Sequence, residues 1–200
     1  MKVAVAKYPI QAPADFAAFA ERQAAVLGAA AAQGARVAVL PEYLSLELAA
    51  TFDAGTRADL HASLAAIQRH RDDWLALYAR LAASLDIYVV AGTFLLAHGD
   101  GRYRNRCDVF APQGAHLWQD KLQLTGFEKG LGVIEGGDAL KVFDLDGVRT
   151  GVAVCYDSEF PLPVRAQAEA GARLLLVPSC TDTEAGATRV RVGCLARALE

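Results

Sequence analysis

The sequence predicts an α/β protein with a mixed β-sheet. Short apolar runs typical of buried strands alternate with longer amphipathic segments typical of helices along the 200 residues. In the middle of the chain this alternation gives way to short strands separated by turn residues, which indicates hairpins. Parallel strands with helical crossovers and antiparallel hairpins together give a mixed sheet covered by helices. The length favours a single domain over residues 1–200.

The first half of the chain supplies three predicted buried strands and two long helical regions. The first predicted strand runs from Val3 to Ala6, between Lys2 and Lys7, and apolar runs follow at Val37 to Leu40 and at Ile87 to Gly92. Helical spacing of apolar residues predicts a helix from about Ala14 to Gln33, ended by Gly34, and a second helical region from about Ala58 to Ser84.

The second half is richer in strands and turns. The predicted strands are Thr93 to Ala97, Tyr103 to Ala111, Ala115 to Lys121, Ala139 to Leu145, Val148 to Cys155 and Leu174 to Val177. Asp146-Gly147 predicts a hairpin turn, and the stretch from Thr125 to Asp138 predicts a Gly-rich loop. Helices are predicted from about Leu162 to Ala170, capped by Gly171, and from about Glu184 to the last residue.

Composition and charge exclude several classes of protein. Hydrophobic residues make up 54% of the chain, which excludes a disordered protein. A net charge of -3 argues against a protein that binds nucleic acid by neutralising phosphates, and against a polybasic membrane-surface patch. The sequence contains neither the GxGxxG nor the Walker A pattern, which excludes the two commonest nucleotide sites.

The cysteines and the first residues predict a cytoplasmic protein. Cys107, Cys155, Cys180 and Cys194 show no CxxC spacing and no histidine at ligand distance, so we expect no zinc site. The apolar stretch after Met1 is too short, and too quickly followed by another charged residue, to be a signal peptide. No apolar run approaches the ~20 residues of a membrane helix. Reduced thiols in the cytoplasm are therefore expected, although four cysteines leave a disulfide pair open.

Three polar residues stand directly after predicted strands, where α/β proteins place catalytic groups. Glu42 follows the strand that ends at Leu40, and partial burial there would raise its pKa and suit it to act as a base. The alternative is a solvated or capping glutamate. Lys121 ends another strand and can stabilise negative charge on an oxygen. The alternative is a surface lysine paired with Asp120 or Glu128.

Cys155 is the third of these residues. It lies between a strand and a predicted helix, a placement that exposes a side chain and directs backbone N–H groups toward it. Both features favour a thiolate nucleophile, whereas the alternative is a buried structural cysteine. His61, His70, His98 and His116 follow no strand in this way, and we interpret them as structural or solvated. If Cys155 is a nucleophile, its base is therefore expected to be a carboxylate.

The three residues and their neighbours resemble the carbon-nitrogen hydrolase (nitrilase) superfamily, in its amidase-like branch. The matching motifs are Leu40-Pro41-Glu42, Asp120-Lys121-Leu122 and Gly151 to Asp157 continuing to Phe160-Pro161, with Ala196 to Glu200 near the end. Each motif alone is weak, but the ordered set covers the chain from Val3 to Glu200.

The resemblance implies an αββα sandwich with a Cys-Glu-Lys site. It implies Cys155 as the nucleophile, Glu42 as the general base and Lys121 as the stabiliser of the tetrahedral intermediate. Glu128 is similar to a second glutamate that positions substrate, and the N–H of Tyr156 would also bind the oxyanion. The implied reaction is hydrolysis of a small linear amide by water, releasing ammonia through a thioester. It needs neither a metal nor an organic cofactor, and the implied assembly is a homodimer or larger homo-oligomer.

The sequence departs from the family pattern in two places and leaves alternatives open. Leu162 stands where many members have an acidic residue, and the stretch after Pro178-Ser179 lacks a common aromatic residue. A carbamoyl-amide hydrolase or a nitrilase with the same three residues is an alternative. The final helix has no stop signal at Glu200, so we expect the family fold to continue beyond this residue. A non-catalytic, truncated interaction domain or a thiol redox protein are alternatives of other classes.

Overall fold

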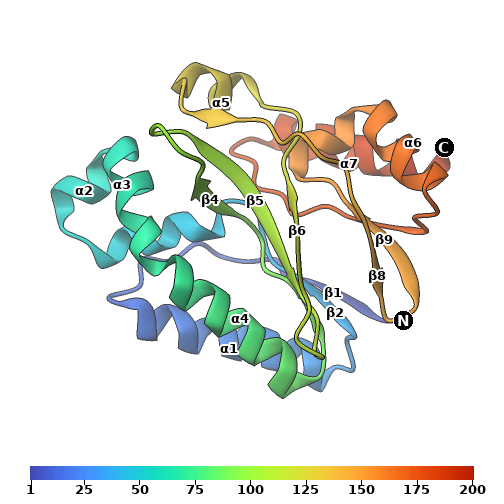
Figure 1. Cartoon of the computed structure of the whole chain (residues 1–200), viewed down its shortest axis with the longest axis horizontal. Helices are drawn as coiled ribbons and strands as arrows, with labels where there is room; N and C mark the ends of the chain where they lie inside the picture. Colours follow the sequence, from blue (N-terminus) through green and yellow to red (C-terminus); the bar gives the residue numbers. More distant parts are fainter.

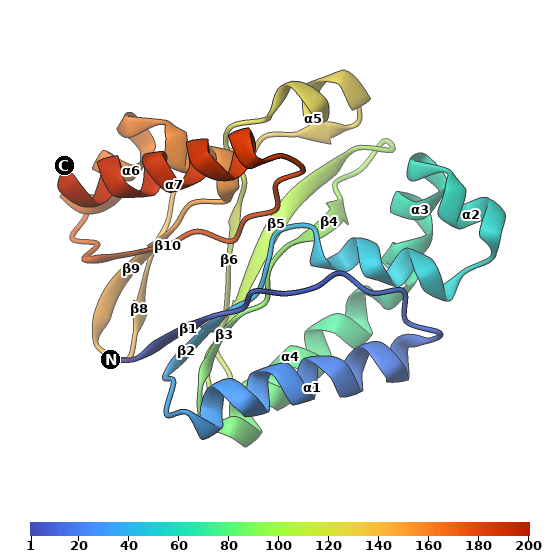
Figure 2. The ribbon, with the colours of Figure 1, turned by 180° about the vertical axis from the view of Figure 1, so that it is seen from behind.

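The computed structural model describes residues 1–200 and has four layers, in the order helix, sheet, sheet, helix (Figures 1 and 2). Helices α1 (Phe16–Ala32) and α4 (Arg71–Leu85) cover the outer face of the first sheet. Helices α6 (Pro161–Glu169) and α7 (Glu184–Leu199) lie against the second sheet, on the opposite side of the molecule. This order of layers confirms the predicted αββα sandwich.

The first sheet has seven strands and is mixed. Strands β1, β2 and β3 are parallel in that order, and β5 then pairs antiparallel with β3, β4 and β6 and parallel with β7. The strands are β1 (Val3–Val5), β2 (Val37–Val39), β3 (Tyr88–Val90), β4 (Phe94–Ala97), β5 (Tyr103–Phe110), β6 (His116–Asp120) and β7 (Ile134–Glu135).

The second sheet has three strands and faces the first. Strand β9 (Val148–Val152) pairs antiparallel with β8 (Val142–Leu145) and parallel with β10 (Leu174–Leu176). Asp146 and Gly147 have φ angles of 56° and 75°, so the predicted hairpin turn is confirmed. Apolar side chains of both sheets form one core between them; they include Val37, Val39, Val90, Val109, Phe143, Leu145, Val152 and Leu176.

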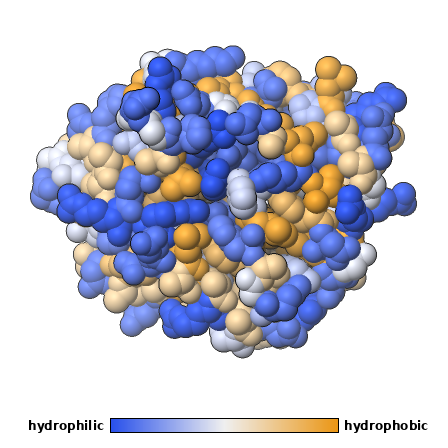
Figure 3. Space-filling model, in the orientation of Figure 1, coloured by the Kyte–Doolittle hydropathy of each residue, from blue (hydrophilic) through white to orange (hydrophobic).

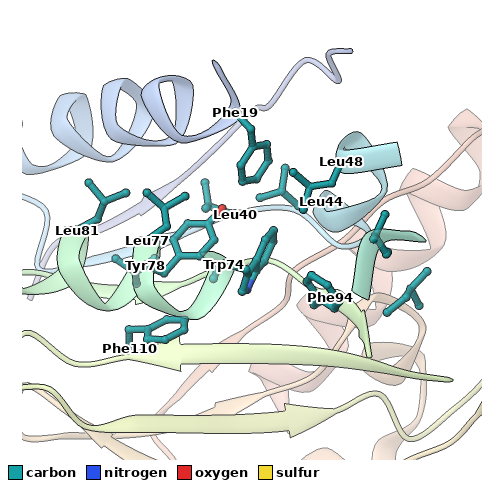
Figure 4. Close-up of a cluster of buried hydrophobic side chains, with 14 of the residues drawn as sticks. Phe19, Leu40, Leu44, Leu48, Trp74, Leu77, Tyr78, Leu81, Phe94 and Phe110 are labelled. Atoms are coloured by element: carbon teal, nitrogen blue, oxygen red, sulfur yellow. The ribbon is translucent and has the colours of Figure 1, made fainter. Parts of the chain in front are cut away.

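A second, larger core lies between the first sheet and its helices. Trp74 and Tyr78 of α4 pack edge to face, with ring centroids 4.7 Å apart, and Trp74 also contacts Phe94 of β4 (Figure 4). Phe19 of α1 stacks on Trp74 from the other side. Each of these aromatic side chains is fully buried, so this helix layer holds the sheet rigidly from one face.

Two predicted segments differ from the structure. The helical region from Ala58 to Ser84 is broken, because a 3₁₀ turn η2 (Gln68–His70) separates α3 (Leu60–Ile67) from α4. A 3₁₀ helix η1 (Leu44–Thr51) and the short helix α2 (Ala54–Ala58) precede it and were not predicted. Asp53 and Asp59 accept hydrogen bonds from Thr56 N and Ala62 N, so each caps a separate helix.

The predicted Gly-rich loop from Thr125 to Asp138 also contains regular structure. Helix α5 (Gly126–Leu131) begins after Thr125, whose hydroxyl accepts a hydrogen bond from Glu128 N, and β7 follows it. The Glu128 carboxylate in turn accepts a hydrogen bond from Thr125 N at 2.9 Å. This reciprocal capping box stabilises a helix that the glycines within it would otherwise disfavour.

The face of the molecule shown in Figure 3 is mostly hydrophilic, with hydrophobic groups between the polar side chains. None of the helices combines the length and the apolar character that crossing a membrane requires. All four cysteines are free thiols in the structure. The predicted cytoplasmic location and the single-domain assignment stay predictions.

Candidate active site

The residues that follow strands β2, β6 and β9 meet at one end of the sandwich. Glu42, Lys121 and Cys155 line a single pocket of about 490 Å³, together with Tyr43, Tyr156 and Cys180. The side chains of Glu42 and Lys121 are each 1% exposed. The solvated or surface alternatives for Glu42 and Lys121 are therefore wrong.

The turn that carries Glu42 is held tightly against β3. Gly92, just after β3, has a φ of +67°, and a Cβ atom there would lie 2.1 Å from the carbonyl oxygen of Pro41. Only glycine fits this close approach of two backbones. On the other side of Glu42, Tyr43 adopts a left-handed φ of 61°, and its N–H donates to Thr93 Oγ1 at 2.7 Å. The backbone therefore fixes where the carboxylate points.

Lys121 lies between two glutamates. Its Nζ is 2.8 Å from Glu42 Oε1 and 2.9 Å from Glu128 Oε2. Asp120, the alternative partner, is instead bound by Arg106, with 2.7 Å between Arg106 Nε and Asp120 Oδ1. The ammonium group has three donors, and two of them are used by the glutamates. One donor therefore remains for a group in the pocket.

Glu128 is the more strongly hydrogen-bonded of the two glutamates. Besides Lys121, it accepts hydrogen bonds from Tyr43 Oη at 2.6 Å, from Asn105 Nδ2 at 3.2 Å, and from the N–H and hydroxyl of Thr125 at 2.9 and 3.0 Å. Glu42 accepts hydrogen bonds from Lys121 Nζ, Asn105 Nδ2 at 2.9 Å and Cys180 N at 3.2 Å. The two carboxylates therefore lie in different environments.

These environments move the two pKa values apart. Burial raises the pKa of Glu42 above its ordinary value, and the attraction of Lys121 offsets this only in part. Burial also acts on Glu128, but Lys121, Tyr43 and the N–H of Thr125 outweigh it and hold the pKa of Glu128 below its ordinary value. Burial alone would lower the pKa of Lys121, yet the two carboxylates keep that pKa above its ordinary value. Of the two glutamates, Glu42 is thus the better proton acceptor and Glu128 the fixed anion.

Cys155 sits at a strained turn after β9. Its φ is 48°, in the left-handed region that a non-glycine residue rarely adopts, and it begins the 3₁₀ helix η3 (Cys155–Glu159). Its N–H donates to Pro178 O at 2.9 Å, and its Sγ lies 3.7 Å from Cys180 O. This geometry confirms the predicted strand–turn–helix placement.

Two expectations about the thiol are wrong. The residue is 5% exposed rather than open, because the backbone of residues 178–180 covers it. Burial, reinforced by the charge of Glu42, raises the pKa of the Cys155 thiol to about 12, with Lys121 only partly opposing this. The resting group is therefore a neutral thiol, and it needs a base to become a nucleophile.

Asp157 joins the turn of Cys155 to the segment after Lys121. Its carboxylate accepts hydrogen bonds from Leu122 N at 3.1 Å, Gln123 N at 2.6 Å and Val154 N at 3.1 Å. Burial raises the pKa of Asp157 to about 6, although these three N–H groups favour the charged form. The residue belongs to one of the sequence motifs, but its bridging role requires the tertiary structure.

Two further polar residues of the cluster were missed by the sequence reasoning. Asn105 lies inside β5 and bonds both Glu42 and Glu128, and Tyr43 supplies the hydroxyl that bonds Glu128. Cys107 and Val109, at the same parity in β5 as Asn105, belong to the core between the sheets. Asn105 could have been found from the sequence, because it is a polar residue at a strand position that faces the core, and a buried polar group needs hydrogen-bond partners.

The histidines lie away from the pocket, as predicted. His70 packs between Phe16 and Phe52, and His116 stacks on Phe110 and bonds Asp108. His61 and His98 are exposed. No group of three or more histidine, cysteine, aspartate or glutamate side chains is arranged to hold a metal ion.

Comparison with known proteins gives matches over the whole chain. The carbon-nitrogen hydrolase family model matches residues 2–199. The chain is 28% identical over 202 residues to the probable hydrolase YhcX of Bacillus subtilis, covering all of this chain and 38% of that protein. It is 31% identical over 184 residues to hydrolase Rv0480c of Mycobacterium tuberculosis, covering 88% of this chain and 60% of that protein.

Similarity to a vertebrate omega-amidase covers a shorter segment. Omega-amidase NIT2-B of Xenopus laevis is 27% identical over 132 residues, covering 62% of this chain and 48% of that protein. The chain thus spans 38% to 60% of the lengths of these three relatives.

Solved structures show the same fold. The NitN amidase of Nesterenkonia sp. AN1 superposes with a TM-score of 0.72 at 22% identity, covering 94% of this chain and 70% of that one. Nit3 of Saccharomyces cerevisiae, a member of branch 10 of the nitrilase superfamily, superposes with a TM-score of 0.75 at 21% identity, covering 98% and 70%. Both likenesses confirm the predicted fold class.

Proposed function

The chain belongs to the carbon-nitrogen hydrolase family of the nitrilase superfamily, and on this premise we propose that it is an amidase. In this proposal it hydrolyses small linear amides to a carboxylic acid and ammonia through a thioester on Cys155. Glu42 is the general base, and Lys121 stabilises the tetrahedral intermediate. The observation that carries the proposal is one pocket lined by the buried Cys155 thiol, by Glu42 with its raised pKa, and by Lys121, whose Nζ lies 2.8 Å from Glu42 Oε1.

The first half of the proposed reaction forms the thioester. Glu42 accepts the proton of the Cys155 thiol while the sulfur attacks the carbonyl carbon of the amide. The carbonyl oxygen becomes negative and is stabilised by the remaining Lys121 donor and by the N–H of Tyr156. Collapse of this intermediate breaks the C–N bond, and the proton held by Glu42 passes to the nitrogen, so that ammonia leaves.

The second half of the reaction restores the enzyme. A water molecule in the place of the ammonia gives its proton to Glu42 and attacks the thioester carbon. The C–S bond breaks, the acid is released, and the proton on Glu42 returns to the sulfur of Cys155. In each half of the reaction Glu42 thus accepts one proton and then gives it up, and its raised pKa suits both steps.

Glu128 serves in this scheme as a positioning residue rather than a second base. Its lowered pKa keeps it anionic, so that it holds Lys121 charged and directs its ammonium group. An unpaired Lys121 in this buried place would lose its proton and with it the ability to stabilise an oxyanion.

Several relatives carry names consistent with this proposal. The Xenopus protein is named an omega-amidase and the Nesterenkonia protein an amidase. One structure of a mutant of the Nesterenkonia amidase shows the result of Michael addition of acrylamide at its active-site cysteine. Carbamoyl-amide hydrolase and nitrilase remain the alternatives, because they use the same three residues.

A substrate panel tests the proposal. Ammonia release is measured from simple amides, carbamoyl amines and nitriles, with Cys155→Ala as the control. The amidase predicts release from amides that Cys155→Ala abolishes, whereas release from nitriles or carbamoyl amines alone would select an alternative. Turnover unchanged in Cys155→Ala would overturn the thioester mechanism. Absence of turnover from every compound by the folded chain would favour the non-catalytic alternative.

We also propose that the protein forms a homodimer or larger homo-oligomer. Exposed large hydrophobic side chains gather on the outer helix layer, namely Leu162 of α6 and Val192, Leu195 and Leu199 of α7. Apolar surface of this kind is a common site of association. Light scattering after size exclusion tests the assembly, and Leu195→Glu is expected to shift it toward a monomer.

A further inference from the structure

Asn105 of β5 bonds both glutamates of the active site. Its Nδ2 donates to Glu42 Oε1 at 2.9 Å and to Glu128 Oε1 at 3.2 Å, which uses both hydrogens of the amide. Its Oδ1 has no hydrogen-bond partner, although the residue is 0% exposed. Reversing the amide would place this oxygen against two carboxylates, so the glutamates fix the orientation of the amide.

Stability alone does not explain a buried amide whose oxygen is unpaired. A buried acceptor without a hydrogen bond destabilises a fold, because it has lost its water and gained no partner. The next inward residues of β5, Cys107 and Val109, are members of the core between the sheets. An asparagine among them is therefore expected to serve the two carboxylates that its Nδ2 binds.

The two oxygens of Glu42 have different neighbours. Oε1 accepts hydrogen bonds from Asn105 Nδ2 at 2.9 Å and from Lys121 Nζ at 2.8 Å, whereas Oε2 accepts one from Cys180 N at 3.2 Å. The carbonyl oxygen of Cys180 lies 3.7 Å from Cys155 Sγ, so Oε2 is the oxygen that shares a neighbour with the thiol. An oxygen that already accepts two side-chain donors is a poorer proton acceptor than one that accepts a single backbone N–H.

We propose that Asn105 is a positioning residue that reserves Glu42 Oε2 for the proton of Cys155. Together with Lys121 it occupies Oε1, so that the carboxylate presents its other oxygen to the thiol and later to the attacking water. The proton then passes from Cys155 Sγ to Glu42 Oε2, and the hydrogen bonds on Oε1 stay in place. This inference rests on the proposed role of Glu42 as the base.

Removal of the Asn105 amide is expected to change the pH at which Glu42 loses its proton. Hydrogen bonds donated to a carboxylate favour its charged form, so their loss raises the pKa of the group. In Asn105→Leu, Lys121 remains as the side-chain donor to Glu42 Oε1, and we expect Glu42 to hold its proton to a pH about one unit higher. The titratable groups that face Glu42 are Tyr43 beside it, Lys121 after β6, Glu128 of α5, Cys155 of η3 and Cys180 after β10.

The pH dependence of kcat for an amide is measured in Asn105→Leu and in a matched control, Gln167→Leu. Gln167 of α6 is also buried, donates from Nε2 to Lys141 O and Val152 O at 3.1 Å each, and also has an unpaired amide oxygen. Its two acceptors are neutral carbonyl groups. Asn105→Leu is expected to move the acid limb of the profile upward by about one pH unit and to lower kcat about tenfold below that limb. Gln167→Leu is expected to leave the limb in place, whatever it does to stability.

Alkylation of Cys155 separates failure of this inference from failure of the proposed function. Its rate with iodoacetamide, followed at Cys155 by peptide mass spectrometry across pH, depends on the base and needs no amide. A limb of this rate that moves upward in Asn105→Leu but not in Gln167→Leu supports the role of Asn105, even if no amide is turned over.

A second variant keeps the inference testable if Asn105→Leu does not fold. Asn105→Asp keeps the size of the side chain but, when ionised, replaces the two donors by a further anion, so both limbs are expected to move upward at least as far. Cys155-dependent amide hydrolysis in which the limbs of the folded Asn105 variants coincide with those of the parent would overturn the inference and leave the amidase intact.

Discussion

Two clusters of ionisable side chains, each built around a buried carboxylate, differ in a way that separates a reactive site from a structural one. The first, here called the pocket cluster, is Glu42, Lys121 and Glu128. The second, the β5 cluster, is Arg71, Asp108 and His116. Both contain a carboxylate with almost no exposure: the side chain of Glu42 is 1% exposed and that of Asp108 is 0% exposed.

In the β5 cluster one buried carboxylate is paired with one guanidinium group and a histidine. Arg71 binds Asp108 through two hydrogen bonds, of 2.6 and 2.9 Å, and His116 Nε2 lies 3.0 Å from Asp108 Oδ1. Although burial would raise the pKa of Asp108, these two partners outweigh it and hold the pKa below its ordinary value. The pocket cluster has two carboxylates for one cation, and burial raises the pKa of Glu42. Burial of a charge alone is thus no sign of catalysis; an unequal charge balance at a pocket is the stronger sign.

The largest expected effect of this difference is on turnover. Glu42→Gln is expected to lower kcat for amides by about 10³-fold or more, because the Cys155 thiol, with a pKa of about 12, has no other base beside it. Asp108→Asn, the matched substitution in the β5 cluster, is expected to leave kcat of the folded fraction within about twofold, a small change on the scale of a lost catalytic base. Steady-state ammonia release at saturating amide measures both. A comparable fall in the two variants would remove the distinction between the clusters.

The next effect is on stability. Lys121→Met leaves two buried carboxylates without their cation, and we expect the free energy of unfolding to fall by about 3–5 kcal/mol at pH 8. The loss is expected to be smaller at pH 5, where one of the carboxyls takes up a proton. Arg71→Met leaves Asp108 with His116 as a remaining partner, so its loss is expected to be smaller than that of Lys121→Met. Urea denaturation at the two pH values measures these differences, and a pH-independent loss in Lys121→Met would contradict them.

The sequence predicts which strands exist and which residues follow them, and this is why Glu42, Lys121 and Cys155 were found. Each stands at the end of a predicted strand or directly after it, and the spacing of apolar residues and the turn residues that define such strands are local signals. Asn105, Tyr43 and the bridging role of Asp157 were not found, because their hydrogen bonds join segments far apart in the chain, such as Asn105 and Glu42.

Local sequence patterns also failed to predict that the Cys155 side chain is buried. The strand–turn–helix pattern predicts an exposed Cys155, yet residues 178–180 fold back over it. The break of the predicted long helix at Gln68–His70 has the same origin. Gln68 Nε2 donates to Leu95 O of β4 at 2.8 Å, a contact with a distant segment that the helical spacing of apolar residues does not reveal.

A third prediction uses pH to sharpen the contrast. The native pKa of Glu42 is raised, so this group contributes stability below its ordinary pKa of 4.5 that is lost as pH rises through the native pKa. The native pKa of Asp108 is lowered, so its contribution is present above 3.8 and is lost as pH falls through the native pKa.

Opposite signs follow for the two amide variants. At pH 8, Glu42→Gln is expected to be more stable than the parent, and Asp108→Asn to be less stable. The Glu42→Gln difference should shrink as the pH falls toward 4.5, whereas the Asp108→Asn difference should shrink only as the pH falls below 3.8. Thermal or urea unfolding across this pH range measures the two curves, and a Glu42→Gln variant less stable at pH 8 would show that Glu42 is a structural ion like Asp108.

The smallest expected effect comes from a matched pair of tyrosines. The Tyr43 hydroxyl donates to Glu128 Oε1 at 2.6 Å, whereas the Tyr78 hydroxyl, buried in the helix layer beside the β5 cluster, has no hydrogen-bond partner. Tyr43→Phe removes one of the hydrogen bonds that keep Glu128 anionic, so kcat is expected to fall about fivefold, which corresponds to roughly 1 kcal/mol. Tyr78→Phe removes an unsatisfied buried hydroxyl, so kcat should be unchanged and stability unchanged or slightly higher. Because the two substitutions delete the same atom, a kcat ratio of one between them would show that the hydrogen bond to Glu128 does not contribute to the reaction.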